Sequence, residues 1–128
     1  MNSFMSKKIL IVEDEDLIAK VLCMRLEGLG YKVAVASDGE EGLEMAKKEK
    51  PDLAILDIGL PRIDGNTLCE LIKSEPSTKG AKIIMLTGKK LVGDMEVAFK
   101  SGAEIYVNKP YEWERLLGHI KKLLGETA

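Results

Sequence analysis

One stretch decides the fold of this chain: Leu53-Ala54-Ile55-Leu56-Asp57-Ile58-Gly59-Leu60-Pro61. Its first four residues are an uninterrupted apolar run, and turn-forming residues follow Asp57 at once, a pattern that indicates a strand buried on both faces. Asp57 would then be a carboxylate at the carboxyl end of a central strand. In open parallel sheets, ligands bind at that edge. The sequence therefore makes Asp57 the first candidate for a functional residue.

Strand-like and helix-like segments alternate five times around this stretch. The predicted strands cover residues 7–12, 31–36, 53–57, 82–87 and 103–108. A segment with helical spacing of apolar residues follows each of them. This alternation predicts an α/β fold in which a (βα)5 unit forms a doubly wound parallel sheet. We expect one domain over residues 7–125, with short tails over 1–6 and 126–128.

The order of the strands follows from their polarity and from the handedness of the connections. Lys32 interrupts the second strand, which places that strand at an edge and gives the order 2-1-3-4-5. Right-handed crossovers then put the first and fifth helices on one face of the sheet and the other three helices on the opposite face. Cys23 and Cys69 fall on opposite faces, so we expect no disulfide between them. Ser37 and Glu40 have the spacing of a capping box at the start of the second helix.

Composition and charge argue against several classes of partner. The 128-residue chain has a formal net charge of −2 and no strong basic field, which argues against nucleic acid or an anionic membrane as a partner. The longest apolar runs hold four residues, too few for a signal peptide or a membrane span. We therefore expect a cytoplasmic protein, a monomer or weak dimer, whose output, if the chain is complete, passes through protein contacts.

Acidic residues end two strands that this order makes neighbours. Glu13 and Asp14 follow the first strand and Asp57 ends the third, so all three should meet at one edge. Two like charges about 4 Å apart repel by roughly 4 kcal/mol at an effective dielectric constant near 20, so the cluster needs a cation or a proton. Oxygen ligands without His or Cys favour Mg²⁺, or Mn²⁺. The plainer alternative is that Glu13 and Asp14 only complement the dipole of the first helix.

Two further strands end at the same edge with polar side chains. Thr87 closes the fourth strand with a hydroxyl, and Lys109 closes the fifth with an ammonium. Each alone is an ordinary residue at a strand end. Together with the acids they supply what phosphoryl transfer needs: an oxygen nucleophile, a metal site, a cation and a hydroxyl donor.

With these residues in place, the chain resembles the receiver domain of two-component response regulators over nearly its whole length. The resemblance rests on Glu13-Asp14, Asp57-Ile58-Gly59-Leu60-Pro61-Arg62-Ile63-Asp64-Gly65, Thr87-Gly88 and Asn108-Lys109-Pro110. It implies a flavodoxin-like fold and a signalling domain, which is a phosphoacceptor and not an enzyme in the usual sense.

The resemblance also implies a role for each residue of the edge. Asp57 would accept a phosphoryl group from a sensor histidine kinase or a histidine phosphotransfer protein. Asp14, Asp57 and the Gly59 carbonyl would bind Mg²⁺ directly, with Glu13 acting through a water. Lys109 would pair with a phosphoryl oxygen, and the Lys109-Pro110 peptide is expected to be cis.

A switch is implied as well. The Thr87 hydroxyl would move to the phosphoryl group and Tyr106 would turn inward. The surface made by a weakly started helix near 91–101, the strand 103–108 and the last helix would then change for a protein effector. Gly59 and the basic Lys89 are candidates for tuning the rates of phosphorylation and dephosphorylation.

Rival functions fit the sequence less well. An aspartyl-phosphate hydrolase usually has a second acid two residues after the nucleophile, where this chain has Gly59. A flavin or nucleotide site needs a Gly-rich loop after the first strand, where this chain is acidic. A pseudo-receiver, an interaction module that is never phosphorylated, is the alternative, although this chain keeps the whole residue set.

Overall fold

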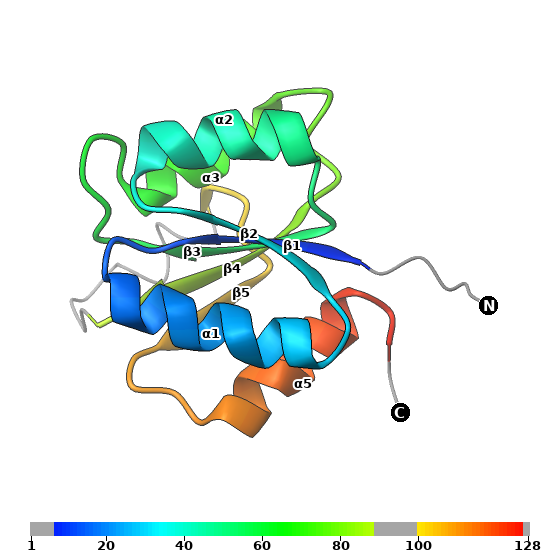
Figure 1. Ribbon diagram of the computed structural model, residues 1–128. Coiled ribbons are helices and arrows are strands. Elements are labelled where there is room, and N and C mark those ends of the chain that lie inside the picture. The colour runs from blue at the N-terminus through cyan, green and yellow to red at the C-terminus, as the bar shows by residue number, and fades with distance from the viewer. Residues whose placement is uncertain (1–6, 89–99, 127–128) are drawn as a thin grey trace.

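The computed structural model describes residues 7–88 and 100–126 of the chain. Its five parallel strands form one sheet in the order β2-β1-β3-β4-β5, which confirms the predicted fold class and strand order (Figure 1). Lys32 marked β2 correctly as an edge strand. The strands are β1 (Lys8–Val12), β2 (Lys32–Ala36), β3 (Leu53–Asp57), β4 (Lys82–Thr87) and β5 (Ile105–Asn108).

Helices cover both faces of the sheet. In Figure 1, α2 and α3 lie on one side of the strands, and α1 and α5 lie on the other. Their bounds are α1 (Asp16–Gly28), α2 (Gly39–Glu49), α3 (Gly65–Ser74) and α5 (Trp113–Leu123). These positions confirm the predicted faces for four helices. The remaining predicted helix, near 91–101, falls almost wholly on residues 89–99, which lie outside the described part of the chain.

The core has two layers because β1 and β3 are apolar on both faces. Leu10 and Leu56 pack in the layer under α2 and α3, whereas Ile11 and Ile55 pack in the layer under α1 and α5. All four side chains are at most 1% exposed. The apolar run before Asp57 therefore forms the central strand, as predicted, and Asp57 lies at the end of this strand, at the edge of the sheet.

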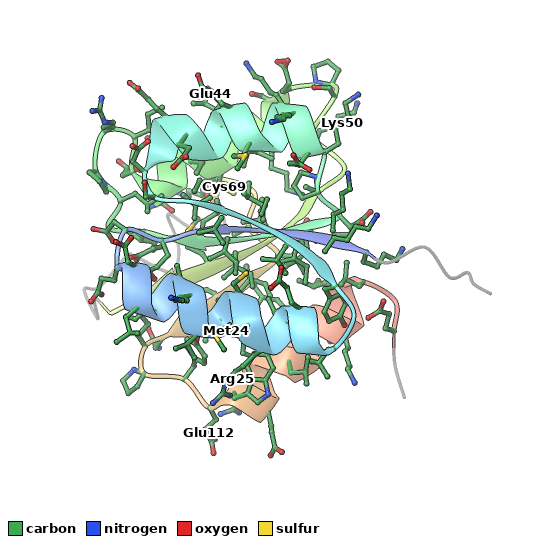
Figure 2. The ribbon with its side chains drawn as sticks, viewed as in Figure 1. Met24, Arg25, Glu44, Lys50, Cys69 and Glu112 are labelled. Atoms are coloured by element: carbon green, nitrogen blue, oxygen red, sulfur yellow. The ribbon has the colours of Figure 1, made fainter. Side chains whose placement is uncertain are left out.

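The two cysteines lie in different layers. Cys69, on α3, is buried in the layer between α3 and the sheet, and Cys23, on α1, packs against the layer on the other side of the sheet. Both are free thiols, as the strand order predicted. Figure 2 labels Cys69 between the sheet and the helices above it.

The start of α2 differs from its prediction by one residue. The N-cap is Asp38, whose carboxylate accepts a hydrogen bond of 2.8 Å from the Glu41 backbone N–H. Glu41 in turn accepts from the Ser37 backbone N–H at 2.7 Å. The predicted Ser37–Glu40 capping box is therefore wrong, because Asp38 is the residue that accepts from the first turn and Glu41 is the residue that accepts from Ser37.

The loop after β3 is held by two glycines that allow close contact between backbones. A Cβ at Gly65 would lie 2.3 Å from the Asp57 carbonyl oxygen, and one at Gly39 would lie 2.1 Å from the Ile63 carbonyl oxygen. The Gly65 N–H also donates to the Ile58 carbonyl at 2.9 Å. These contacts fold the 58–64 loop back over the end of β3 and so fix the position of Asp57.

Candidate functional site

Three carboxylates meet at the carboxyl edge of β1 and β3. One oxygen each of Glu13, Asp14 and Asp57 lies within 4.8 Å of the other two. Glu13 is 3% exposed, Asp57 is half-buried and Asp14 is exposed. The strand order alone brings these residues together, since Val12 of β1 pairs with Leu56 of β3 immediately before the acids. The predicted acidic cluster therefore exists.

Glu13 is the buried member of this cluster. Its backbone N–H extends the β1–β2 pairing beyond Val12 by donating to the Ala36 carbonyl at 3.0 Å. Its carboxylate accepts from the Glu15 backbone N–H at 3.2 Å. Burial raises the pKa of Glu13 above its ordinary value, and the charge of Asp57 adds to that rise, although the hydrogen bond from Lys109 opposes it.

Lys109 supplies the positive charge of the site. Its Nζ lies 2.9 Å from Glu13 Oε1 and 3.4 Å from Asp57 Oδ2. Burial disfavours the charged ammonium, but the two carboxylates outweigh this effect, so the pKa of Lys109 lies above its ordinary value. The Lys109-Pro110 peptide is cis, as expected. In this state Lys109 therefore neutralises part of the acidic cluster.

Asp57 presents its carboxylate beside an open loop. The Gly59 backbone N–H donates to Asp57 Oδ1 at 3.2 Å, and the Ile58 N–H extends the β3–β4 pairing by donating to the Leu86 carbonyl at 3.0 Å. Among the described residues, no heavy atom lies within 4 Å of the place where a Cβ at Gly59 would be. The surface at Gly59, two residues after Asp57, is therefore open.

The other predicted residues lie where the strand order puts them. Thr87 ends β4, is 1% exposed and stands opposite Asn108 of β5. Its carbonyl accepts from the Lys109 backbone N–H at 2.7 Å, which ties the end of β5 to that of β4. Tyr106 is half-buried on β5 and packs against the layer under α2 and α3. The proposed roles of Thr87, Tyr106 and Gly59 stay predictions, and Lys89 lies outside the described residues.

An exposed apolar stripe on α1, beside the site, was not predicted from the sequence. Leu17 is 73% exposed, Val21 45% and Met24 63%. Figure 2 labels Met24 and its neighbour Arg25 on the side of α1 that faces away from the sheet. The signal was present, because positions 17, 21 and 24 are spaced for one face of a helix, separate from the buried stripe of α1.

A small cavity continues this stripe toward the loop after Lys109. Its volume is about 220 Å³, and it lies between α1 and the start of α5. The Arg25 guanidinium stands 4.9 Å from the centre of the Trp113 ring in a cation–π contact. The residues that line the cavity are Val21, Leu22, Arg25, Tyr111 and Trp113.

Together these features can bind a hard divalent cation and hold an anion beside it. Three carboxylates supply oxygen ligands, and the Lys109 ammonium can hold an anionic group that reaches Asp57.

Within the described ranges, 7–88 and 100–126, no helix has the length and apolarity to cross a bilayer.

Comparisons with known proteins place the chain among signalling proteins. The model of the family described as the response regulator receiver domain matches residues 9–121. The alkaline phosphatase synthesis transcriptional regulatory protein PhoP of Bacillus subtilis is 40% identical over 123 residues, which span 96% of this chain and 50% of that protein. The DNA-binding dual master transcriptional regulator RpaA of Synechocystis is 36% identical, over 94% of this chain and 50% of that protein. The chain thus spans about half the length of these relatives.

Solved structures agree in fold. A response regulator structure from Chloroflexus aurantiacus J-10-fl superposes with a TM-score of 0.88 at 39% identity, covering 94% of this chain and 99% of that one. The receiver domain of a sensor histidine kinase from Pseudomonas aeruginosa PAO1 superposes with a TM-score of 0.86 at 29% identity, covering 94% and 99%. That domain has a magnesium ion coordinated in its active-site cleft.

One expectation from the sequence is overturned by these comparisons. The near-neutral net charge was taken to exclude nucleic acid as a partner, yet RpaA, which matches over nearly all of this chain, is a DNA-binding regulator. The exclusion was wrong because the net charge of 128 residues describes only those residues. This net charge carries no information about the half of PhoP or RpaA that the chain does not match.

Proposed function

This chain belongs to the family of response regulator receiver domains, and on that premise we propose that Asp57 accepts a phosphoryl group from a phosphohistidine donor in a Mg²⁺-dependent reaction. One observation carries the proposal: carboxylate oxygens of Glu13, Asp14 and Asp57 lie within 4.8 Å of one another, with the Lys109 ammonium against two of these residues.

The chemistry is a transfer between two nucleophiles. A carboxylate oxygen of Asp57 forms a bond to phosphorus while the P–N bond of the donor phosphohistidine breaks, and the imidazole leaves with the electron pair. The product is an acyl phosphate on Asp57. Its new charge favours cations and hydrogen-bond donors nearby, which are the roles that we propose for Lys109 and Thr87.

The residues fit a Mg²⁺ ion. Asp14 and Asp57 offer carboxylate oxygens, Gly59 would add its backbone carbonyl, and Glu13 would act through a water. Their oxygens are the hard ligands that Mg²⁺ prefers. Within residues 7–88 and 100–126, one ammonium, that of Lys109, pairs with the three carboxylates, so the cluster keeps excess negative charge. When bound, the ion would neutralise charge on the phosphoryl oxygens.

We propose that the donor protein docks on α1. Leu17, Val21 and Met24 form an exposed apolar stripe on the helix that begins just after Glu13 and Asp14. An apolar helix face of the donor laid across this stripe would bring its phosphohistidine to Asp57. The cavity that Arg25 and Trp113 line would take a side chain at the margin of that contact.

The output would be a change in the face that includes β5 and α5. Movement of Thr87 toward the phosphoryl group would open space that the Tyr106 ring can fill, and the altered face would bind a protein effector. In a protein of the full length of the relatives, the same switch would control DNA binding.

The acceptor is tested with a small phosphoryl donor. We expect the wild-type chain to gain the mass of one phosphoryl group only when Mg²⁺ is present, and Asp57→Asn to gain none. Glu70→Gln, which removes an exposed carboxylate from α3, is the matched control and should behave as wild type. A pseudo-receiver would gain no mass in any arm, and label retained by Asp57→Asn would assign the acceptor elsewhere.

The docking surface is tested separately with a phosphorylated histidine phosphotransfer protein as donor. We expect Met24→Ser to slow transfer from this protein and to leave labelling by the small donor unchanged. Leu71→Ser, which alters an exposed leucine of α3, is the control. Equal slowing by the two variants would disprove docking on α1.

A further inference from the structure

The edge of the sheet opposite Asp57 carries a row of lysines. Lys7 precedes β1, Lys32 begins β2, Lys82 begins β4, and Lys50 ends α2 just before β3. Backbone bonds bring them side by side: the Lys32 N–H donates to the Lys7 carbonyl and the Lys82 N–H to the Asp52 carbonyl, each at 3.0 Å. Figure 2 labels Lys50 at the end of α2, on the side of the sheet where β1 begins. We call these four residues the amino-edge lysines.

Their charges are not balanced locally. Among the residues that the structure describes, none of the four ammoniums makes an ion pair. Acids at this edge contact other residues. Glu49 Oε1 lies 3.8 Å from Lys8 Nζ, and Asp52 Oδ2 accepts from the Lys8 backbone N–H at 2.8 Å. Glu104 Oε2 lies 2.8 Å from Lys73 Nζ, and Glu126 accepts from the Tyr31 hydroxyl. Charge is therefore distributed unevenly over the sheet: carboxylates gather at its carboxyl edge and lysines at its amino edge. The net charge of −2 does not show this distribution.

The surface at the amino edge is hollowed and partly apolar. Two cavities of about 280 and 370 Å³ meet at Pro51. Lys32 and Val33 line the smaller one. Residues of the larger one include Lys7, Lys50, Lys82, Leu123 and Leu124. Lysines and apolar side chains therefore line the same two cavities, together with the acids Glu49 and Asp52.

We propose that the amino-edge lysines bind a short acidic polypeptide segment that also carries apolar side chains. Carboxylates of the segment would pair with the ammoniums, and its apolar side chains would cover Val33, Pro51 and the two leucines. From β2 to β4 the row crosses three inter-strand spacings, about 14 Å, which four or five extended residues can span. DNA could use the ammoniums but would leave the apolar side chains uncovered, so the surface favours a peptide.

This binding goes beyond phosphoryl transfer and does not depend on it. The amino-edge lysines are at the opposite edge of the sheet from Asp57, so the Asp57→Asn variant should bind the segment as well as wild type does. A failure of the peptide proposal would leave the phosphorylation result untouched, and the reverse also holds.

The test uses fluorescence anisotropy of a labelled peptide that alternates glutamate with leucine. We expect saturable binding that weakens as salt is added, because exposed ion pairs are screened. The double variant Lys32→Gln/Lys82→Gln should weaken binding about tenfold, the loss expected from two such pairs. Lys20→Gln/Arg115→Gln removes the same charge from exposed positions of α1 and α5 and should bind like wild type.

Two other ligands decide what kind of partner the surface takes. A peptide that alternates glutamate with serine should bind more weakly than the leucine peptide, and a short DNA duplex should not displace the leucine peptide. The proposal is overturned by no binding, by equal loss in the two double variants, by equal binding of the serine peptide, or by tighter binding of the duplex. Circular dichroism of each variant establishes that it is folded.

Discussion

The Lys109 ammonium lies 2.9 Å from a carboxylate oxygen of Glu13, a residue 96 positions earlier in the chain. The same ammonium is 3.4 Å from Asp57. The cation of the site is therefore already held by two of the carboxylates that we assign to the metal site. Lys109 and Mg²⁺ must then compete for this negative charge.

The competition predicts that Lys109→Met binds Mg²⁺ more tightly than wild type. Removal of one screened positive charge at this distance contributes about 1 kcal/mol, or roughly a fivefold lower Kd. Calorimetric titration with Mg²⁺ measures the change, and Lys20→Met, which removes an exposed charge from α1, is the control. Weaker or unchanged binding in Lys109→Met would show that the ammonium does not oppose the ion.

Binding of Mg²⁺ should also be lost on acidification sooner than at a site of exposed carboxylates. Burial raises the pKa of Glu13, so this side chain takes up a proton at a higher pH than an ordinary glutamate does. Protonation removes a charge from the cluster, and the affinity therefore falls as the pH drops through that raised value. Titrations over a pH series would show it, and in Glu13→Gln the fall should move to lower pH. A profile unchanged in Glu13→Gln would contradict the assignment.

Much of the site could be predicted from the sequence because strand ends are easy to locate. Asp57, Thr87 and Lys109 each close an apolar run, and the strand order then brings the ends of those runs to one edge. Periodicity and the polarity of β2 were enough for that order. The position of Asp57 thus needed no knowledge of side-chain packing.

The choice of hydrogen-bond partners could not be predicted in the same way. Asp38 and Ser37 are both suitable caps, and only the geometry of the turn selects Asp38 for α2. The bond from Tyr31 to Glu126 joins residues 95 positions apart and has no local signature. The amino-edge lysines were hidden for a similar reason, since they are scattered along the chain and only the sheet brings them together.

The close contact at Gly65 predicts a large loss of stability in Gly65→Ala. The new Cβ would lie 2.3 Å from the Asp57 carbonyl oxygen and 2.7 Å from the Ile58 Cα, and backbone atoms cannot move aside cheaply. We expect a loss of about 2 kcal/mol or more in the free energy of unfolding, together with slower phosphorylation of Asp57. Urea denaturation measures the first effect.

Gly118→Ala is the matched control for that experiment. Gly118 lies inside α5, and no heavy atom of the described residues is within 4 Å of its would-be Cβ. Alanine is favoured over glycine within a helix, so this variant should gain roughly 0.5–1 kcal/mol. If both variants lost stability equally, the contact at Gly65 would not be the cause.

The Tyr31–Glu126 hydrogen bond predicts how stability changes in alkali. Tyr31 is 9% exposed, and its hydroxyl donates to Glu126 Oε1 at 2.5 Å. Burial, and then the bond to Glu126, raise the pKa of Tyr31 above its ordinary value of about 10. The folded chain therefore holds this proton more tightly than the unfolded chain does. The resulting stabilisation is fully present below pH of about 10 and is lost as the pH rises through the raised pKa.

Tyr31→Phe isolates this contribution. It should cost about 1 kcal/mol at neutral pH, the usual value of one hydrogen bond, and the difference from wild type should shrink above pH of about 10. Lysines also titrate in this range, so the quantity to measure is the difference between the two unfolding free energies at each pH. Glu126→Gln keeps an oxygen acceptor but removes the charge, and should give an intermediate profile. A difference that stays constant with pH would show that the Tyr31 proton is not held by the fold.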